Sequence, residues 1–182
     1  MKDNNIQEVL SLLKLFLPEV YVGSIFHISP DFLKKRRIKG IITDLDNTLV
    51  EWDRPNATPK LMEWFNMMEK SGIKVTIVSN NNEKRVRLFS EPLGIPFISE
   101  AKKPMRRAFH KALASMGLSK DEVVVIGDQL LTDVLGGNRS GFKTILVVPV
   151  SSTDGFWTRL NRKIERKILS TLKRKGMLKW EE

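Results

Sequence analysis

The chain has 182 residues and a mass of 20.9 kDa, which fits one globular domain. Hydrophobic residues make up 41% and charged residues 29%, a composition that excludes a disordered chain and a membrane-embedded helix bundle. The chain has no cysteine, which excludes disulfides, iron–sulfur clusters and thiolate zinc sites. Its net charge of +10 is typical of proteins that meet a polyanion.

The positive charge is concentrated at the two ends of the chain. Residues 1–43 carry +3, residues 44–155 only +1, and residues 156–182 carry +6. A nearly neutral middle between basic ends separates a candidate chemical core from candidate docking elements. We expect an N-terminal amphipathic helix and connecting segment over residues 1–37, a catalytic domain over 38–150 and a basic amphipathic C-terminal helix or tail over 151–182.

In chain order, an amphipathic helix over residues 6–17 comes first, and no window approaches the ~18–20 apolar residues that span a bilayer. From residue 38 onward, short apolar runs alternate with helical patterns, which predicts an α/β fold with parallel strands. The expected strands cover residues 38–43, 75–78, 97–98, 123–126 and 144–148, and the two clearest helices cover 59–70 and 104–116. In the helix over 59–70 we expect the core to be filled by Leu61, Met62, Trp64, Phe65, Met67 and Met68.

The basic C-terminal stretch also has an apolar stripe. Its members recur at helical spacing: Trp157, Leu160, Ile164, Ile168 and Leu172. Such a helix can lie on an anionic bilayer, or it can dock its stripe on the protein core. The amphipathic pattern alone does not separate these two alternatives.

Polar side chains stand directly after three of the expected strands, at Asp44, Ser79 and Asp128. The carboxyl ends of parallel strands meet at one edge of a sheet, so these side chains should converge. Asp44 and Asp46 are two carboxylates separated by one residue, so that one can attack phosphorus while the other handles the proton. An isolated motif of this kind is more typical of a strand-closing turn. Here a second acidic pair, Asp128 and Asp133, follows a later strand.

Four short signatures occur in a fixed order: Asp44-Leu45-Asp46-Asn47-Thr48, Ser79-Asn80, Lys103-Pro104, and Gly127-Asp128 with Asp133 five residues after Asp128. Together they resemble the haloacid dehalogenase (HAD) superfamily of phosphatases over about residues 38–150. The resemblance implies a Rossmannoid three-layer α/β fold with a central, mostly parallel sheet.

The resemblance also implies roles for the acidic residues. Asp44 would be the nucleophile that forms an aspartyl-phosphate, and Asp46 would protonate the leaving alcohol and then activate water. Asp44, the backbone carbonyl of Asp46 and Asp128 would hold Mg²⁺, with Asp133 in support. Thr48 would orient the nucleophile loop.

Phosphate binding is expected from Ser79, the backbone at Asn80 and Lys103. Lys103 is preferred to Lys102 because the lysine of the family directly precedes proline. Only 35 residues separate Asp44 from Ser79 and 24 separate Ser79 from Lys103, which leaves no room for an inserted cap domain. By resemblance, capless members act on large substrates that themselves shield the site from water.

Residues 12–18 and 127–139 resemble one branch in particular, the YqeG-type phosphatases of HAD subfamily IIIA, which are related to mitochondrial phosphatidylglycerophosphatase. This resemblance implies dephosphorylation of phosphatidylglycerophosphate to phosphatidylglycerol. The expected partners are an anionic membrane surface and its lipid phosphate, with the protein cytoplasmic and peripherally associated with the inner face of the membrane.

Two other functions remain open at this point. A HAD phosphatase that acts on a protein or a soluble phosphoester would keep the same chemistry without the membrane. A ribosome- or nucleic-acid-associated binding protein would use the basic tail. We disfavour nucleic acid because the tail has few interleaved aromatic residues and no recognised binding motif.

Overall fold

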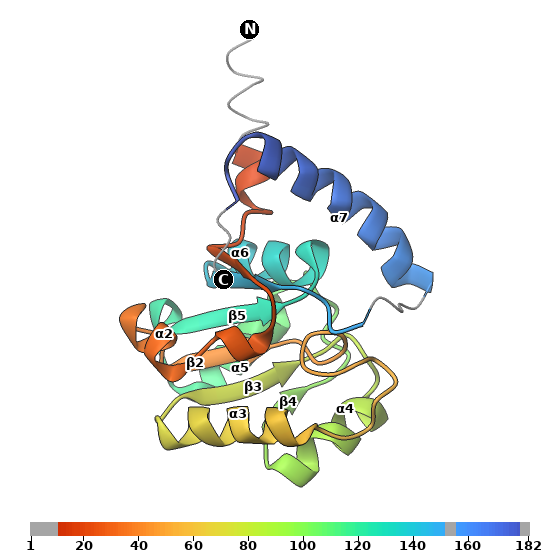
Figure 1. Ribbon diagram of the computed structural model, residues 1–182. Helices are drawn as coiled ribbons and strands as arrows, with labels where there is room; N and C mark the ends of the chain where they lie inside the picture. The colour runs from red at the N-terminus through yellow and green to blue at the C-terminus, as the bar shows by residue number, and fades with distance from the viewer. Residues whose placement is uncertain (1–10, 152–155, 179–182) are drawn as a thin grey trace, which may run out of the picture.

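The computed structural model describes residues 11–151 and 156–178, and its centre is one sheet of six parallel strands (Figure 1). The strand order is β1-β6-β5-β2-β3-β4, and every neighbouring pair is parallel. The strands are β1 (Val20–Val22), β2 (Gly40–Thr43), β3 (Lys74–Val78), β4 (Phe97–Ile98), β5 (Val123–Gly127) and β6 (Lys143–Val147). The predicted α/β fold with a central parallel sheet is confirmed.

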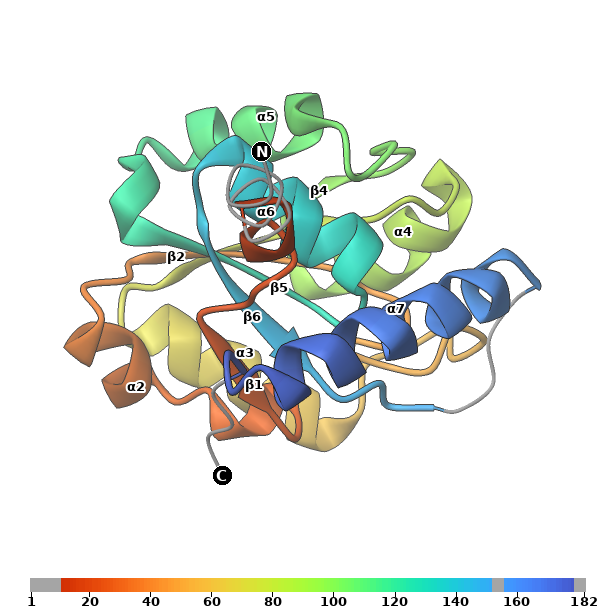
Figure 2. The ribbon, with the colours of Figure 1, turned by 90° about the horizontal axis from the view of Figure 1, so that it is seen from above.

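Helices cover both faces of the sheet, which gives three layers (Figures 1 and 2). Alternate residues of β2 point to opposite faces, so Ile41 packs in the core beneath α3 while Ile42 packs in the core beneath α5. The α-helices are α2 (Pro30–Lys35), α3 (Pro59–Lys70), α4 (Glu83–Ser90), α5 (Arg106–Met116), α6 (Leu135–Ser140) and α7 (Phe156–Arg174). Short helical turns are η1 (Ile25–His27), η2 (Glu91–Leu93), η3 (Lys120–Glu122) and η4 (Leu130–Val134), the last of them π-helical.

Helix α3 begins and ends where its sequence predicts. The hydroxyl of Thr58 accepts a hydrogen bond from the backbone N–H of Leu61, and Pro59 occupies the first helical turn. The predicted face of Leu61, Trp64, Phe65 and Met68 is buried. The prediction was wrong for Met62 and Met67, which are 41% and 48% exposed because they lie on the helix surface that points away from the sheet.

The N-terminal segment is fastened to the sheet beyond the predicted helix. Residues 6–10 of the helix expected over residues 6–17 lie outside the described residues, residues 11–14 are helical, and the helix ends before residues 15–17, where the prediction was wrong. The side-chain amide of Asn138 donates to the backbone carbonyls of Leu15 and Leu17, at 2.9 and 3.0 Å. The chain then forms β1, an edge strand that pairs with β6.

Helix α7 packs on the sheet, but not through the whole predicted stripe. Leu172 is buried, and Ile168 and Leu169 pack against a small cluster formed by η4 and β6. Ile164 is 47% exposed, while its neighbour Glu165 is buried, so at this turn of the helix Glu165 takes the inward position that was expected for Ile164. The side chains of Trp157 and Leu160 lie outside the described set.

Nothing resembling a cap domain interrupts the described catalytic segment. Between β2 and β3 there is one loop and α3, and between β3 and Lys103 there are only α4, η2 and β4. Among residues 11–151 and 156–178, no helix combines the length and the apolarity needed to cross a bilayer.

Candidate active site

Polar residues gather in a pocket at the carboxyl edge of the sheet. Asp44, Ser79 and Asp128 directly follow β2, β3 and β5, as the sequence predicts. The pocket has a volume of ≈ 330 Å³. Its lining consists of Asp44, Asp46, Asn47, Trp52, Ser79, Asn80, Asn81, Lys103, Gln129 and Thr132.

Three buried carboxylates form the base of this site. One ligand oxygen from each of Asp44, Asp128 and Asp133 lies within 4.8 Å of the other two. The hydroxyl of Thr48 donates to Oδ1 of Asp128 at 2.8 Å. Thr48 therefore contacts the acidic cluster itself, which is a more specific placement than the loop-orienting role expected from the sequence.

Lys103 lies among these carboxylates. Its Nζ is 2.8 Å from Oδ1 of Asp44 and 2.6 Å from Oδ1 of Asp133, whereas the side chain of Lys102 is exposed. Burial by itself lowers the pKa of Lys103, but the charges and hydrogen bonds of Asp133 and Asp44 outweigh it and hold the pKa above its ordinary value. The lysine is therefore a fixed positive charge beside Asp44.

The backbone around Lys103 is held by the side chain of Asn80. Oδ1 of Asn80 accepts from the backbone N–H of Lys103 at 2.6 Å, and Nδ2 donates to its carbonyl at 3.2 Å. The sequence suggested only a backbone contact to phosphate at Asn80, so this clamp is an additional function. Ser79 is buried next to it, and its Oγ accepts from the backbone N–H of Asn81 at 3.1 Å.

Asp133 is fixed beneath the end of β5. Its Oδ2 accepts from the backbone N–H of Gln129 at 3.2 Å. A Cβ at Gly127 would lie 2.2 Å from Cγ of Asp133, so only glycine allows this close approach. The glycine of the Gly127-Asp128 signature therefore makes room for the acidic residue at its end.

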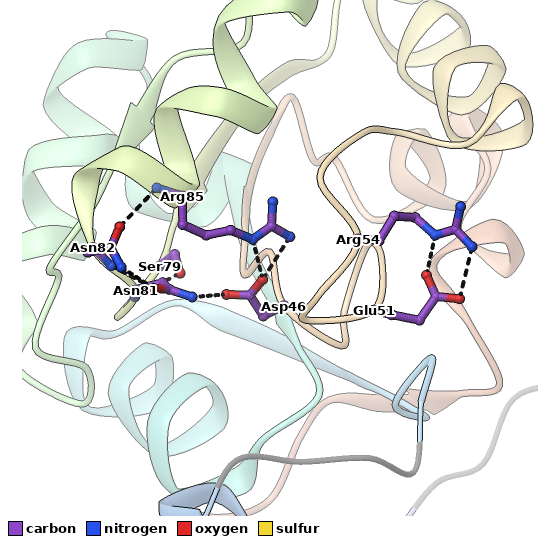
Figure 3. Close-up of polar contacts among 7 residues, drawn as sticks. All are labelled: Asp46, Glu51, Arg54, Ser79, Asn81, Asn82 and Arg85. Atoms are coloured by element: carbon purple, nitrogen blue, oxygen red, sulfur yellow. Dashed lines mark hydrogen bonds and ion pairs between the residues drawn. The ribbon is translucent and has the colours of Figure 1, made fainter.

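The side chain of Asp46 accepts hydrogen bonds from Arg85 of α4 and from Asn81, which lies just before that helix (Figure 3). Nε and Nη2 of Arg85 donate to its Oδ1 at 3.2 and 2.9 Å, and Nδ2 of Asn81 donates to its Oδ2 at 2.9 Å. Burial raises the pKa of Asp46, and the charge of Asp44 adds to this, although the bonds from Asn81 and Arg85 oppose it. The raised pKa fits a group that gives and takes a proton in a reaction.

Four residues at or behind the site were not predicted from the sequence. Arg85 and Asn81 hold Asp46, the exposed ring of Trp52 lines the pocket, and buried Glu165 accepts from the backbone N–H of Leu131. The run of three asparagines after β3 is a signal that could have drawn attention to the first two. Glu165 is a charged residue on an amphipathic helix, and its sequence context gives no comparable signal.

The acidic cluster fits a divalent cation. Three buried carboxylates face one ammonium group, and buried charge without compensation is costly. Carboxylate oxygens are the ligands that hard divalent cations prefer. Asp44, Asp128 and Asp133 therefore supply both the charge and the donor atoms for such an ion.

A larger hollow of ≈ 670 Å³ lies elsewhere, near the start of β3 and the ends of α3 and α5. Met62, Phe65, Ile73 and Met116 are among the residues that line it, and none of the predicted site residues does. Of these two pockets, only the one of ≈ 330 Å³ is lined by Asp44, Asp46 and Lys103, so it is the candidate active site.

Known proteins resemble this chain in sequence and in fold. The profile of the family described as "Mitochondrial PGP phosphatase" matches residues 2–151. The chain is 70% identical over 171 residues to the "Probable phosphatase YqeG" of Bacillus subtilis (strain 168), over 94% of this chain and 99% of that protein. It is 25% identical over 184 residues to the "Phosphatidylglycerophosphate phosphatase 1, chloroplastic/mitochondrial" of Arabidopsis thaliana, over 96% of this chain and 53% of that protein.

Among solved structures, the cobalt-bound deoxy-D-mannose-octulosonate 8-phosphate phosphatase of Haemophilus influenzae matches with a TM-score of 0.53 and 17% identity. The match covers 75% of this chain and 90% of that one, and at this identity it concerns the fold alone. With its four signatures gathered at one sheet edge, the chain belongs to the mitochondrial PGP phosphatase family, of the YqeG type, and is a phosphatase with a HAD-like fold.

Proposed function

We propose that the protein is a Mg²⁺-dependent phosphatase that converts phosphatidylglycerophosphate to phosphatidylglycerol at an anionic membrane surface. The observation that carries the proposal is an open pocket in which a buried carboxylate and a buried lysine meet beside exposed apolar side chains. The printed names of the family and of the Arabidopsis relative favour this lipid as the substrate.

The chemistry proposed for the pocket uses its own side chains. Asp44 attacks phosphorus, while Lys103 and Ser79 bind the phosphoryl oxygens and offset their charge. Asp46 gives a proton to the leaving alcohol and later takes one from the attacking water. Asp44, Asp128 and Asp133 would hold Mg²⁺, which supplies Lewis-acid stabilisation of the phosphoryl charge when bound.

Apolar side chains around the pocket support a lipid substrate. Trp52 is 47% exposed and lines the pocket, and Val148 and Val150 are exposed just after β6. The backbone N–H of Val150 donates to the carbonyl of Asn47 at 2.8 Å, which ties this segment to the nucleophile loop. The loop after β2, the segment after β6 and the start of α7 lie at the same end of the molecule (Figures 1 and 2).

The outer side of α7 supports an anionic surface as the partner. Lys163, Ile164 and Lys167 are exposed, and they combine positive charge with an apolar side chain on one helix. Each basic residue close to an anionic bilayer contributes about 1 kcal/mol to binding. Docking the inner face of α7 on the core leaves this outer face available, so the two alternatives for the helix are compatible.

The test is phosphate release from phosphatidylglycerophosphate in phosphatidylglycerol-containing vesicles, compared with release from glycerol phosphate, with Mg²⁺ and with EDTA. We expect Mg²⁺-dependent release from the lipid and none from the Asp44→Asn variant. Hydrolysis of glycerol phosphate with the lipid left intact would contradict the lipid assignment and favour a soluble or protein substrate.

Membrane docking has its own measurement, which is co-sedimentation with the same vesicles. The triple variant Lys163→Gln, Ile164→Ser, Lys167→Gln should sediment less than the wild type and lose part of its activity on vesicles. The variant Met67→Ser, exposed on α3, is the matched control. Equal sedimentation of all three proteins would exclude α7 as the docking element.

A further inference from the structure

The contact between Arg85 and Asp46 has an unusual geometry. Both Nε and Nη2 of Arg85 donate to the same oxygen, Oδ1, at 3.2 and 2.9 Å (Figure 3). The nearby pair of Arg54 and Glu51 is the ordinary alternative, because there the two guanidinium nitrogens bind two different carboxylate oxygens. Arg85 therefore leaves Oδ2 of Asp46 to other partners.

The two oxygens of Asp46 consequently differ in what they can still accept. A carboxylate oxygen has two lone pairs, and both of those on Oδ1 are used by Arg85. Oδ2 accepts one hydrogen bond, from Nδ2 of Asn81 at 2.9 Å. One lone pair of Oδ2 is left, and it is the position on the carboxyl group where a proton can reside.

We propose that Arg85 is the positioning residue of the proton-transferring carboxyl group, and that it assigns the transferable proton to Oδ2 of Asp46. The inference rests on the proposed role of Asp46 in phosphate ester hydrolysis, and it adds which atom moves the proton and which residue fixes that atom.

In the proposed cycle, Oδ2 of Asp46 gives up one proton and later takes one back. In the first half, the bond between Asp44 and phosphorus forms, the bond from phosphorus to the leaving oxygen breaks, and the proton of Oδ2 passes to that oxygen. Negative charge then appears on Asp46 next to the guanidinium group of Arg85, which stabilises it. In the second half, water attacks phosphorus, its proton returns to Oδ2, and the bond to Asp44 breaks.

Both donors have further contacts that favour this orientation. The backbone N–H of Arg85 donates to Oδ1 of Asn82, the residue that caps α4, and the guanidinium carbon lies 5.7 Å from the ring centroid of Phe89. Oδ1 of Asn81 accepts from the backbone N–H of Asn82 at 2.8 Å, so its amide nitrogen is directed to Asp46. The side chains of Arg85 and Asp46 are only 14% and 18% exposed.

This orientation of the Arg85 guanidinium group costs free energy. That cost argues that the contact between Arg85 and Asp46 is more than a structural ion pair. Nη1 of Arg85 is buried and has no hydrogen-bond partner within the described part of the chain. Leaving a buried donor unpaired is unfavourable, and a fork across both oxygens of Asp46 is the arrangement that stabilises most. The structure keeps the less stable arrangement, which leaves one lone pair of Oδ2 open.

The test compares two phosphate esters that differ in how much they need a proton donor. p-Nitrophenyl phosphate has a leaving group that departs without protonation, whereas glycerol phosphate releases an alkoxide that must be protonated. We expect Arg85→Met to lower kcat/KM for glycerol phosphate by about 100-fold and to lower it much less for p-nitrophenyl phosphate. Arg85→Lys should restore part of the loss because it returns a charged donor.

The matched control is Arg87→Met. Arg87 lies on the same helix, is exposed and pairs with Glu83 and Glu91 rather than with the site. We expect wild-type kcat/KM for both esters from this variant. Melting temperatures of all variants separate loss of folding from loss of proton transfer, and if Arg85→Met does not fold, the smaller but still ester-selective loss in Arg85→Lys decides the question.

Two results would overturn the inference. The first is an equal loss on both esters in folded Arg85 variants, which would make Arg85 a residue for substrate binding or stability. The second is wild-type activity on glycerol phosphate in those variants while Asp46→Asn is inactive on it. Full activity of Asp46→Asn on glycerol phosphate would instead contradict the proposed function, so the two failures are distinguishable.

Discussion

The carboxylate of Glu165 accepts a hydrogen bond from the backbone N–H of Leu131, 3.0 Å away, so helix α7 is tied to the turn η4 that carries Asp133. Ile168 of α7 reinforces the link by packing against the cluster that contains Leu130. The C-terminal helix is therefore part of the support of the acidic cluster, as well as a candidate membrane contact.

Removing the Glu165 carboxylate should affect both stability and activity. Glu165→Ala leaves the N–H of Leu131 without this acceptor in a largely buried place, at a cost of about 1–3 kcal/mol in the free energy of unfolding. Because η4 then loosens around Asp133, we also expect a lower kcat. Urea unfolding and phosphate release measure the two effects.

Two further variants control this experiment. Glu165→Gln keeps an acceptor oxygen and should lie closer to the wild type, and Glu63→Ala removes an exposed carboxylate of α3. If Glu165→Ala has the same free energy of unfolding and the same kcat as Glu63→Ala, the link between α7 and η4 contributes nothing to stability or activity.

The absence of a side chain at Gly127 should be essential. In Gly127→Ala the new methyl group would lie 2.2 Å from Cγ of Asp133, so the aspartate or the end of β5 must move. Overpacking of this kind costs about 1–3 kcal/mol, and displacement of Asp133 should lower kcat as well. Gly23→Ala is the control, since its methyl group would meet only the movable ring of His27. Equal melting temperatures and rates for the two variants would contradict the close-packing argument.

The part of the site that follows strands could be predicted from the sequence. Apolar runs that end in Asp44, Ser79 and Asp128 identify the carboxyl edge of a parallel sheet, where the chain topology brings these residues together. Lys103 could be chosen over Lys102 from the proline after it. The convergence at the strand ends follows from the order of the motifs and the direction of the strands, whereas the choice of Lys103 rests on the family resemblance.

The part of the site that depends on packing between elements could not be predicted in this way. Arg85 turns toward Asp46 because the first turn of α4 lies beside the loop after β2, and no sequence period encodes that distance. On α7, hydrophobicity favoured Ile164 as an inward residue. The structure buries Glu165 instead, because the N–H of Leu131 needs an acceptor there.

The pair of Lys39 and Glu122 should make stability depend on pH at the opposite edge of the sheet. Nζ of Lys39 is 2.6 Å from Oε1 of Glu122, and the backbone N–H of Ser119 donates to Oε2 at 3.0 Å. The hydrogen bond from Lys39, together with those from Ser119, lowers the pKa of Glu122 to about 2, from an unfolded value of about 4.3.

The sign follows from proton binding. Between these two pKa values the unfolded chain binds more protons at Glu122 than the folded chain does, so stability falls as the pH falls. The contribution is complete above about pH 4.3 and disappears as the pH approaches 2. Urea unfolding at pH 6, 4 and 3 should show a difference between wild type and Glu122→Gln that shrinks with acidity. A difference that stays constant over this range would contradict the assignment to Glu122.

Divalent cations should stabilise the folded protein through the acidic cluster. A ligand that binds only the folded state at 100 times its dissociation constant adds about 2.7 kcal/mol to the free energy of unfolding. We therefore expect Mg²⁺ to raise the melting temperature of the wild type and EDTA to reverse the rise. Asp128→Asn removes one of the three buried carboxylates and should abolish most of the shift. The exposed Asp121 lies outside the cluster, so Asp121→Asn should keep the shift. The same Mg²⁺-induced shift in both variants would place the cation elsewhere and remove the cluster as its site.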